Sequence, residues 1–91
     1  MPHYYFHVED HQHYIDEHGM ELADLTAARI EAVRVSSDML RDHAAEFWRL
    51  GEWRVVVTDS EDKILFALSF QAVDPGSLSR TYDRAAGANL G

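Results

Sequence analysis

The sequence predicts an α+β fold of ββαββ order, in which a four-stranded antiparallel sheet has one long helix packed on one face. Three observations predict it. Two pairs of short segments alternate between two faces as strands do. One long run with helical periodicity separates the pairs, and 91 residues leave room for one compact core. We therefore expect a single α+β domain over residues 1–73 and a flexible C-terminal tail over residues 74–91.

The first pair of predicted strands lies near the N-terminus. Residues 4–8 alternate between the two faces of a strand, with Tyr5 and His7 sharing one of them. A polar stretch leads to a short second strand at residues 14–16, which we expect at an edge of the sheet. Gly19 lies in the turn that follows and is expected to adopt a positive φ.

The long helix is predicted over residues 25–49. Asp24 precedes the periodic run and can cap its free amides, and Gly51 follows as a left-handed terminator. On a helical wheel the apolar residues share one side, and these are Leu25, Ala28, Ala32, Val35, Met39 and Phe47. Because such a helix is longer than a seven-residue strand, we expect its end at Trp48 to overhang the sheet.

The second pair of strands carries the strongest strand signal. Residues 53–59 and 64–70 are rich in β-branched and aromatic side chains and are joined by a polar turn. Strict alternation places Ile64 on one face with Phe66 and places Leu65 on the other. The two segments therefore predict a second β-hairpin.

Composition excludes several functional classes. Sixteen acidic against eight basic residues give a net charge of −8, which repels a nucleic-acid backbone, and no basic patch offsets it. Without cysteine there are no disulfides, thiolate metal sites or thiol nucleophiles. No apolar run spans a membrane, no signal peptide is evident, and the isolated glycines form no phosphate loop. We expect a cytoplasmic protein without a cofactor, a nucleic-acid partner or a membrane partner.

Several segments carry a family resemblance. The chain opens on Pro2-His3-Tyr4-Tyr5-Phe6-His7, has Asp16, Gly19, Glu21 and Leu22 before the helix, and has Val57-Thr58-Asp59 followed by Leu65, Leu68 and Phe70. It thereby resembles a family of short uncharacterised alphaproteobacterial proteins of the rhizobial type, known as a domain of unknown function. The resemblance covers residues 2–70 and implies the domain limits and a bacterial cytoplasmic setting.

The chain departs from that family's pattern in two turns. Small turn residues are more usual in the family at residues 11–13, and glycine is common there at Asp62. Because aspartate tolerates the left-handed region, we expect the second turn to persist. The resemblance brings no established activity, so it implies no catalytic or binding residues.

Five of the six histidines lie within the first 18 residues. Neutral imidazole ligates zinc, copper and nickel, and it titrates near physiological pH. A metal- or pH-responsive module is therefore one alternative function, with His3, His7, His11 and His13 as its histidines. A held metal site needs three or four ligands, and His11 and His13 lie on a loop, so solvated surface histidines are the favoured interpretation.

Arg29, Ser36 and His43 are seven residues apart and form a polar line inside the apolar face of the helix. One interpretation is a track lining a cleft, which makes a small ligand-binding or hydrolytic protein a further alternative. The favoured interpretation is a snorkelling Arg29 with Ser36 and His43 partly buried. Because no serine lies in a recognisable nucleophile motif, we expect no enzymatic activity.

The leading functional hypothesis is a non-enzymatic interaction or regulatory module that forms a homodimer or binds a protein partner. If the helix covers one face of the sheet, the opposite face is more apolar than solvation requires. The predicted interaction surface combines that face with the helix end and consists of Tyr5, His7, Val56, Thr58, Leu65, Ala67 and Trp48.

Overall fold

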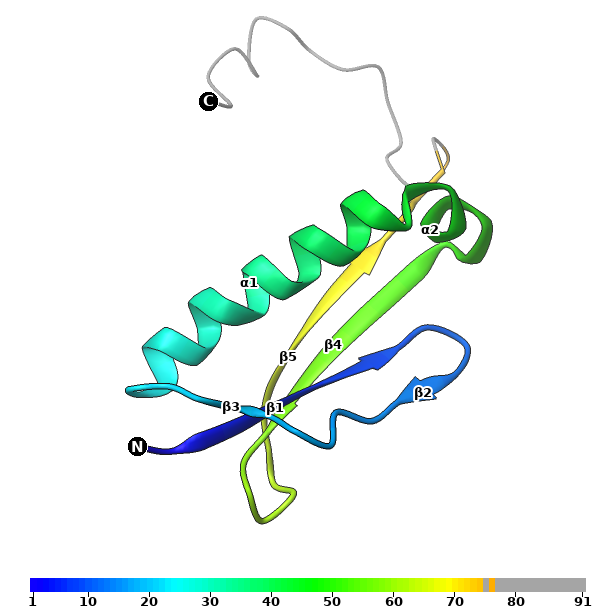
Figure 1. The fold of residues 1–91 in the computed structure, drawn as a ribbon. Helices are drawn as coiled ribbons and strands as arrows, with labels where there is room; N and C mark the ends of the chain where they lie inside the picture. Colours follow the sequence, from blue (N-terminus) through cyan, green and yellow to red (C-terminus); the bar gives the residue numbers. More distant parts are fainter. Residues whose placement is uncertain (75, 77–91) are drawn as a thin grey trace, which may run out of the picture.

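The structure is a computed structural model that describes residues 1–74 and 76. In chain order its elements are β1 (His3–Glu9), β2 (His13–Tyr14), β3 (Met20–Glu21), α1 (Leu25–Asp42), α2 (Ala44–Leu50), β4 (Glu52–Thr58) and β5 (Ile64–Gln71). The strands pair antiparallel, which confirms the predicted α+β class with an antiparallel sheet (Figure 1). The predicted tail over residues 74–91 lies, apart from Asp74 and Gly76, outside the described residues.

The sheet places the N-terminal strand beside a strand from the C-terminal half. Its order is β2-β1-β4-β5, and β3 also pairs with β1. The two central strands are therefore β1 and β4, with Tyr5 opposite Thr58 and His7 opposite Val56. β2 pairs with the end of β1 and β3 with its beginning, so together they form one interrupted edge strand. β5 forms the other edge.

The element order differs from the predicted ββαββ order in two places. The segment after Gly19 adds β3, a two-residue strand that brings the described strands to five. The predicted single helix is two helices that meet at His43, whose φ of −126° and ψ of 36° lie outside the helical region. The bend turns α2 back, so that the Phe47 ring meets the Trp53 ring edge-on at 6.3 Å. Phe47 thereby gains an aromatic contact with β4, whereas Trp48, at the end predicted to overhang the sheet, is exposed.

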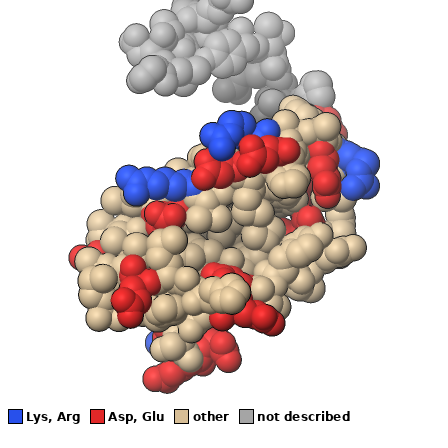
Figure 2. All heavy atoms as spheres, viewed as in Figure 1, with Lys and Arg blue, Asp and Glu red and all other residues tan. Residues whose placement is uncertain are grey.

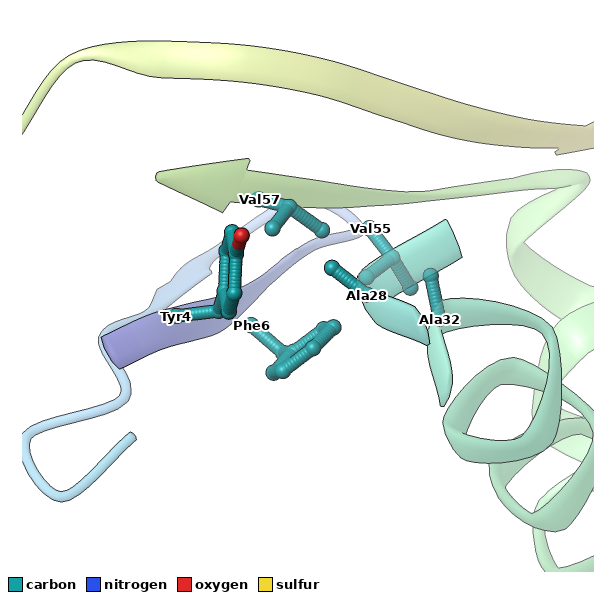
Figure 3. Close-up of a cluster of buried hydrophobic side chains, with 6 residues drawn as sticks. All are labelled: Tyr4, Phe6, Ala28, Ala32, Val55 and Val57. Atoms are coloured by element: carbon teal, nitrogen blue, oxygen red, sulfur yellow. The ribbon is translucent and has the colours of Figure 1, made fainter. Parts of the chain in front are cut away.

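The hydrophobic core lies between α1 and the two central strands. Six buried residues form it, and Figure 3 shows their side chains meeting there: Tyr4, Phe6, Ala28, Ala32, Val55 and Val57. The helix contributes only alanines to this cluster, so its backbone lies close to the sheet. The predicted helix-covered face is confirmed, because Phe66 and Leu68 of β5 also pack against the cluster. Those two side chains stay half-buried.

A β-bulge at the start of β5 changes the predicted faces. Val57 lies opposite Phe66, but Thr58 lies opposite Ile64, so Leu65 is the extra residue. Because opposed residues share a face, Ile64 joins Thr58 on the side away from the helices. Leu65 instead packs against the core. The predicted exposure of Leu65 on the open face and the grouping of Ile64 with Phe66 are therefore wrong.

The predicted signals at the ends of the elements are confirmed. The Asp24 side chain accepts the Ala27 N–H at 2.9 Å as the N-cap of α1. Gly19 and Gly51 have φ values of 67° and 87°, and Gly51 ends α2 in the left-handed region. Asp62 adopts a φ of 64°, so the second turn persists where glycine was expected to be common.

Candidate functional site

We call the side of the sheet away from the helices the open face. At its centre, the side chains of the face itself cover the surface. Val56 and Thr58 project there, yet both are buried. The neighbouring strand covers them with a row of rings, in which Tyr5 lies 5.2 Å from His3 and 6.4 Å from His7 between ring centroids. The predicted interaction surface is therefore not one continuous exposed patch.

Asp16 fills the gap between β2 and β3. Its Oδ2 accepts the Phe6 N–H of β1 at 3.1 Å, and its Oδ1 accepts the N–H groups of His18 and Gly19, each at 3.0 Å. Burial alone would raise the pKa of Asp16, but the backbone N–H donors at Gly19, Phe6 and His18 and the nearby His7 together lower it. The carboxylate thus replaces the strand partner that β1 lacks at this point.

His7 links this edge to the centre of the sheet. Its Nδ1 accepts the Asp16 N–H at 3.0 Å, so that nitrogen carries no proton. The other nitrogen, Nε2, lies 2.9 Å from the Thr58 hydroxyl. In the neutral ring Nε2 carries the proton and donates it to Thr58. His7 therefore has both ring nitrogens occupied by protein groups.

The remaining predicted histidines are dispersed. His3 donates from Nε2 to the His18 carbonyl at 2.8 Å, whereas His11 is exposed on the β1–β2 turn. His13 is exposed and lies 3.4 Å from the carboxylate of Glu9. Among residues 1–74 and 76, no group of three or more histidine, aspartate and glutamate side chains is placed to hold a metal ion. The structure thus does not bring His3, His7, His11 and His13 together.

β5 presents the long edge of the sheet. Apart from the bulge residue Leu65, its eight residues pair with β4 on one side, and β5 pairs with no other strand among the described residues. The strand reads Ile-Leu-Phe-Ala-Leu-Ser-Phe-Gln and contains neither a charged residue nor proline. Charges, proline and short strands are the usual protection of an edge against pairing with another chain. Ala67, from the predicted interaction surface, is exposed on this strand.

An apolar groove lies beside the end of β5, and we call it the β5 groove. It has a volume of about 510 Å³ and is lined by Leu40, Ala44, Phe47, Trp48, Ser69, Phe70 and Gln71. Trp48, at 73% exposure, is among the most exposed large apolar residues. Val33 is also exposed and lies two turns before Leu40, so it extends the apolar flank of α1 away from the groove.

A second concavity lies at the junction of α1 and α2. Its volume is about 310 Å³, and it is lined by Val8, Asp10, Tyr14, Met39, His43, Glu46 and Trp53. The Trp53 ring lies 6.0 Å from the His43 ring and is only 5% exposed. Its buried Nε1–H has no hydrogen-bond partner among the described residues. The lining of this concavity therefore includes a residue with a buried donor, Trp53, and two carboxylates, Asp10 and Glu46.

The predicted polar line on the helix is split between environments. Arg29 and His43 are exposed, whereas Ser36 is 2% exposed and donates its hydroxyl to the Ala32 carbonyl at 2.7 Å. Residues seven apart lie about 10 Å apart along a helix axis. The hydroxyl of Ser36 is thus used within its own helix, whereas His43, expected to be partly buried, is exposed.

Basic side chains are distributed without forming a continuous patch on the face seen in Figure 2, where they lie mainly along the helices among acidic groups. Arg34, Arg41 and Arg49 each pair with the acidic residue three positions earlier, at 3.7, 3.2 and 3.8 Å. Arg54 pairs with Glu9 on the open face at 3.3 Å. Much of the positive charge is therefore matched locally.

Reasoning from the sequence missed the two features on which the site depends. The role of Asp16 depends on a gap in the edge strand, and its only local signal is the Asp-x-x-Gly spacing to Gly19. The exposure of the β5 edge depends on strand order, which the alternation of side chains does not encode. The absence of charge from residues 64–71 was the available signal for an unprotected edge.

Comparison with known proteins identifies a family. The profile of a domain of unknown function, DUF6894, matches residues 3–71, which spans the chain from the start of β1 to the end of β5. No curated protein and no solved structure matches. Within the described part of the chain, neither helix has the length and apolar character needed to cross a membrane.

Proposed function

The chain belongs to the DUF6894 family of unknown function, and from that starting point we propose that it is a small non-enzymatic interaction module that acts by self-association. The observation that carries this proposal is the β5 edge. Along this eight-residue strand, the alternate residues that do not bond to β4 direct their backbone donors and acceptors outward, and the strand contains neither charge nor proline. The bacterial cytoplasmic setting implied by the sequence resemblance belongs to the same proposal.

The exposed apolar groups near this edge support the proposal. Trp48 projects beside the β5 groove, and the adjoining Phe70 is only half-buried. Large aromatic side chains in such positions are typical anchors of protein interfaces. Self-association needs no catalytic group, which agrees with the use of the Ser36 hydroxyl within α1.

The test is the molar mass of the full chain, measured by light-scattering chromatography over a series of protein concentrations. We expect a species of twice the 10.4 kDa chain mass that dissociates on dilution. Trp48→Ser should weaken it, because the truncation removes an exposed aromatic anchor. Ile15→Ser removes an equally exposed apolar group at the opposite edge and should leave it unchanged. A monomer at every concentration contradicts the proposal.

A second candidate function, pH sensing, is favoured by the geometry of His7. Its Nδ1 accepts the Asp16 N–H, so protonation places two donors against each other. The titratable groups around it are the Asp16 carboxylate, the Tyr5 phenol and the more distant His3. Loss of that hydrogen bond would leave the segment between β2 and β3 held to β1 by the Asp16 carboxylate.

This candidate is tested by following amide resonances from about pH 8 to about pH 5, the range in which histidines usually titrate. We expect the Asp16 amide signal to move together with the His7 ring signals. In His7→Gln the Asp16 amide should no longer respond, while His13→Gln serves as the matched exposed control. An Asp16 amide that stays fixed while His7 titrates would rule out this coupling.

A further inference from the structure

We infer that the partner of the β5 edge is the β5 edge of a second copy, paired antiparallel about a twofold axis into one continuous sheet. This inference rests on the proposed self-association and names the surface that performs it. The partner is thus an uncharged strand, and a second molecule of the same protein supplies it.

The two edges of the sheet are unequal, and this points to β5. The other edge consists of β2 and β3, each only two residues long, with the Asp16 side chain inserted between them. Short and interrupted strands are poor templates for pairing. β5 is eight residues long, so among the described strands it is the one edge long enough to pair with an added strand.

Charge restricts where a second copy can bind. Two chains of net charge −8 repel each other wherever their acidic surfaces approach. Residues 64–71 carry no charge, so pairing β5 with itself brings the chains together along their least repulsive segment. Like charges placed directly opposite across a strand pair are destabilising, and this pair contains none.

Side chains on both faces of β5 suit a twofold partner. With a twofold axis perpendicular to the sheet, the half-buried side chains of β5 that face the helices lie beside the same side chains of the second copy. These are Phe66, Leu68 and Phe70. On the open face, the exposed Ala67 leaves a small side chain near the middle of the strand. Each copy also presents a β5 groove with Trp48 beside the joined strands, which extends the contact beyond the backbone.

The test introduces a negative or a positive charge at position 67. If the twofold axis passes Ala67, the two side chains at position 67 lie directly opposite each other. If it passes Leu68, they lie diagonal to each other. Both arrangements are within reach of long side chains. Ala67→Glu alone and Ala67→Lys alone should each raise the dimer dissociation constant at least tenfold. An equimolar mixture of the two variants should form a heterodimer with near wild-type affinity. Ile15→Glu and Ile15→Lys provide the same charges at the other edge and should change nothing.

A second measurement does not depend on these variants. Because the chain has no cysteine, Ala67→Cys or Leu68→Cys introduces a single thiol whose cross-linking reports one position. We expect a short bismaleimide to link two copies at one or both positions and not at Ile15→Cys. Circular dichroism and thermal unfolding check that each variant remains folded.

The outcomes separate this inference from the proposed function. A dimer whose charge variants are rescued by mixing, and which cross-links in the middle of β5, supports both. A dimer whose dissociation constant does not change with charge at position 67, and which does not cross-link there, overturns β5 pairing. The proposed self-association would still hold in that case. A chain that is monomeric throughout overturns both.

Discussion

The carboxylate of Asp16 accepts the backbone N–H of Phe6 at 3.1 Å, on the side of β1 that has no strand partner between β2 and β3. Both carboxylate oxygens are used, because Oδ1 accepts two further amides. Asp16→Asn turns one oxygen into a donor and leaves at least one amide without an acceptor. Since hydrogen bonds to charged groups contribute about 1.5–3 kcal/mol, we expect a loss of about 1–3 kcal/mol in the free energy of unfolding.

Urea unfolding followed by circular dichroism measures this loss, and Asp10→Asn is the matched control. Asp10 also accepts two amides, those of His11 and Gln12, but it does so through one oxygen. An asparagine oxygen can take its place, so the control should lose less than about 0.5 kcal/mol. Equal losses in the two variants would contradict the special role of Asp16.

The Asp16 carboxylate also makes the free energy of unfolding depend on pH in the acid range. Its pKa is lowered in the folded protein, so the carboxylate stabilises the fold above the unfolded pKa of about 3.9, and this stabilisation is lost as pH falls through the lower folded value. We expect the difference in unfolding free energy between the wild type and Asp16→Asn to shrink below about pH 4. Denaturant unfolding at a series of pH values measures it. A difference that is constant across this range would show that Asp16 contributes without its charge.

Gly19 lies against the first strand at a position that admits no side chain. Its φ is 67°, and a Cβ there would lie 2.6 Å from His3 Cδ2 and 2.8 Å from the Tyr4 carbonyl oxygen. Gly19→Ala should therefore destabilise the protein by about 2–4 kcal/mol, because steric overlap adds to the cost of a positive φ. Gly51→Ala shares the positive φ but meets nothing within 4 Å. It should cost only about 1 kcal/mol, and thermal unfolding of the two variants compares them.

The contact between α1 and the sheet depends on small residues. Ala32 is fully buried against the core, so Ala32→Leu should destabilise the protein by about 1–3 kcal/mol or more through overpacking. Ser36→Ala removes a hydroxyl that donates only to the Ala32 carbonyl within the helix, and it should change stability by less than about 0.5 kcal/mol. Urea denaturation distinguishes the two. A large loss in Ser36→Ala would mean that its hydroxyl does more than this one bond.

The sequence predicted those parts of the fold that depend on nearest neighbours. Asp24, Gly51 and Gly19 act through the backbone within a few residues, so their roles as cap, terminator and turn residue follow from local chemistry. The faces of β1 and β4 also followed, because alternation fixes them once a strand forms. This local information was enough for the buried faces of the two central strands.

The features that were not predicted depend on contacts between distant segments. The bulge at Leu65 results from pairing with β4, and one inserted residue exchanges the faces of Ile64 and Leu65. The bend at His43 brings Phe47 to Trp53, and no residue in that segment is a helix breaker. The burial of Val56 and Thr58 results from the rings of β1, which the register between β1 and β4 places beside them. The candidate site was therefore only partly predictable.

The interrupted edge strand also bears on how many copies could join one sheet. A sheet open at both edges can add strands without end, which leads to fibres. Here Asp16 occupies the backbone position at which a further strand would bind, and β2 and β3 offer only two residues each. If two copies pair through β5 as we propose, each uses the long edge that the described residues offer, so pairing stops at two copies and leaves no described edge at which polymerisation could continue.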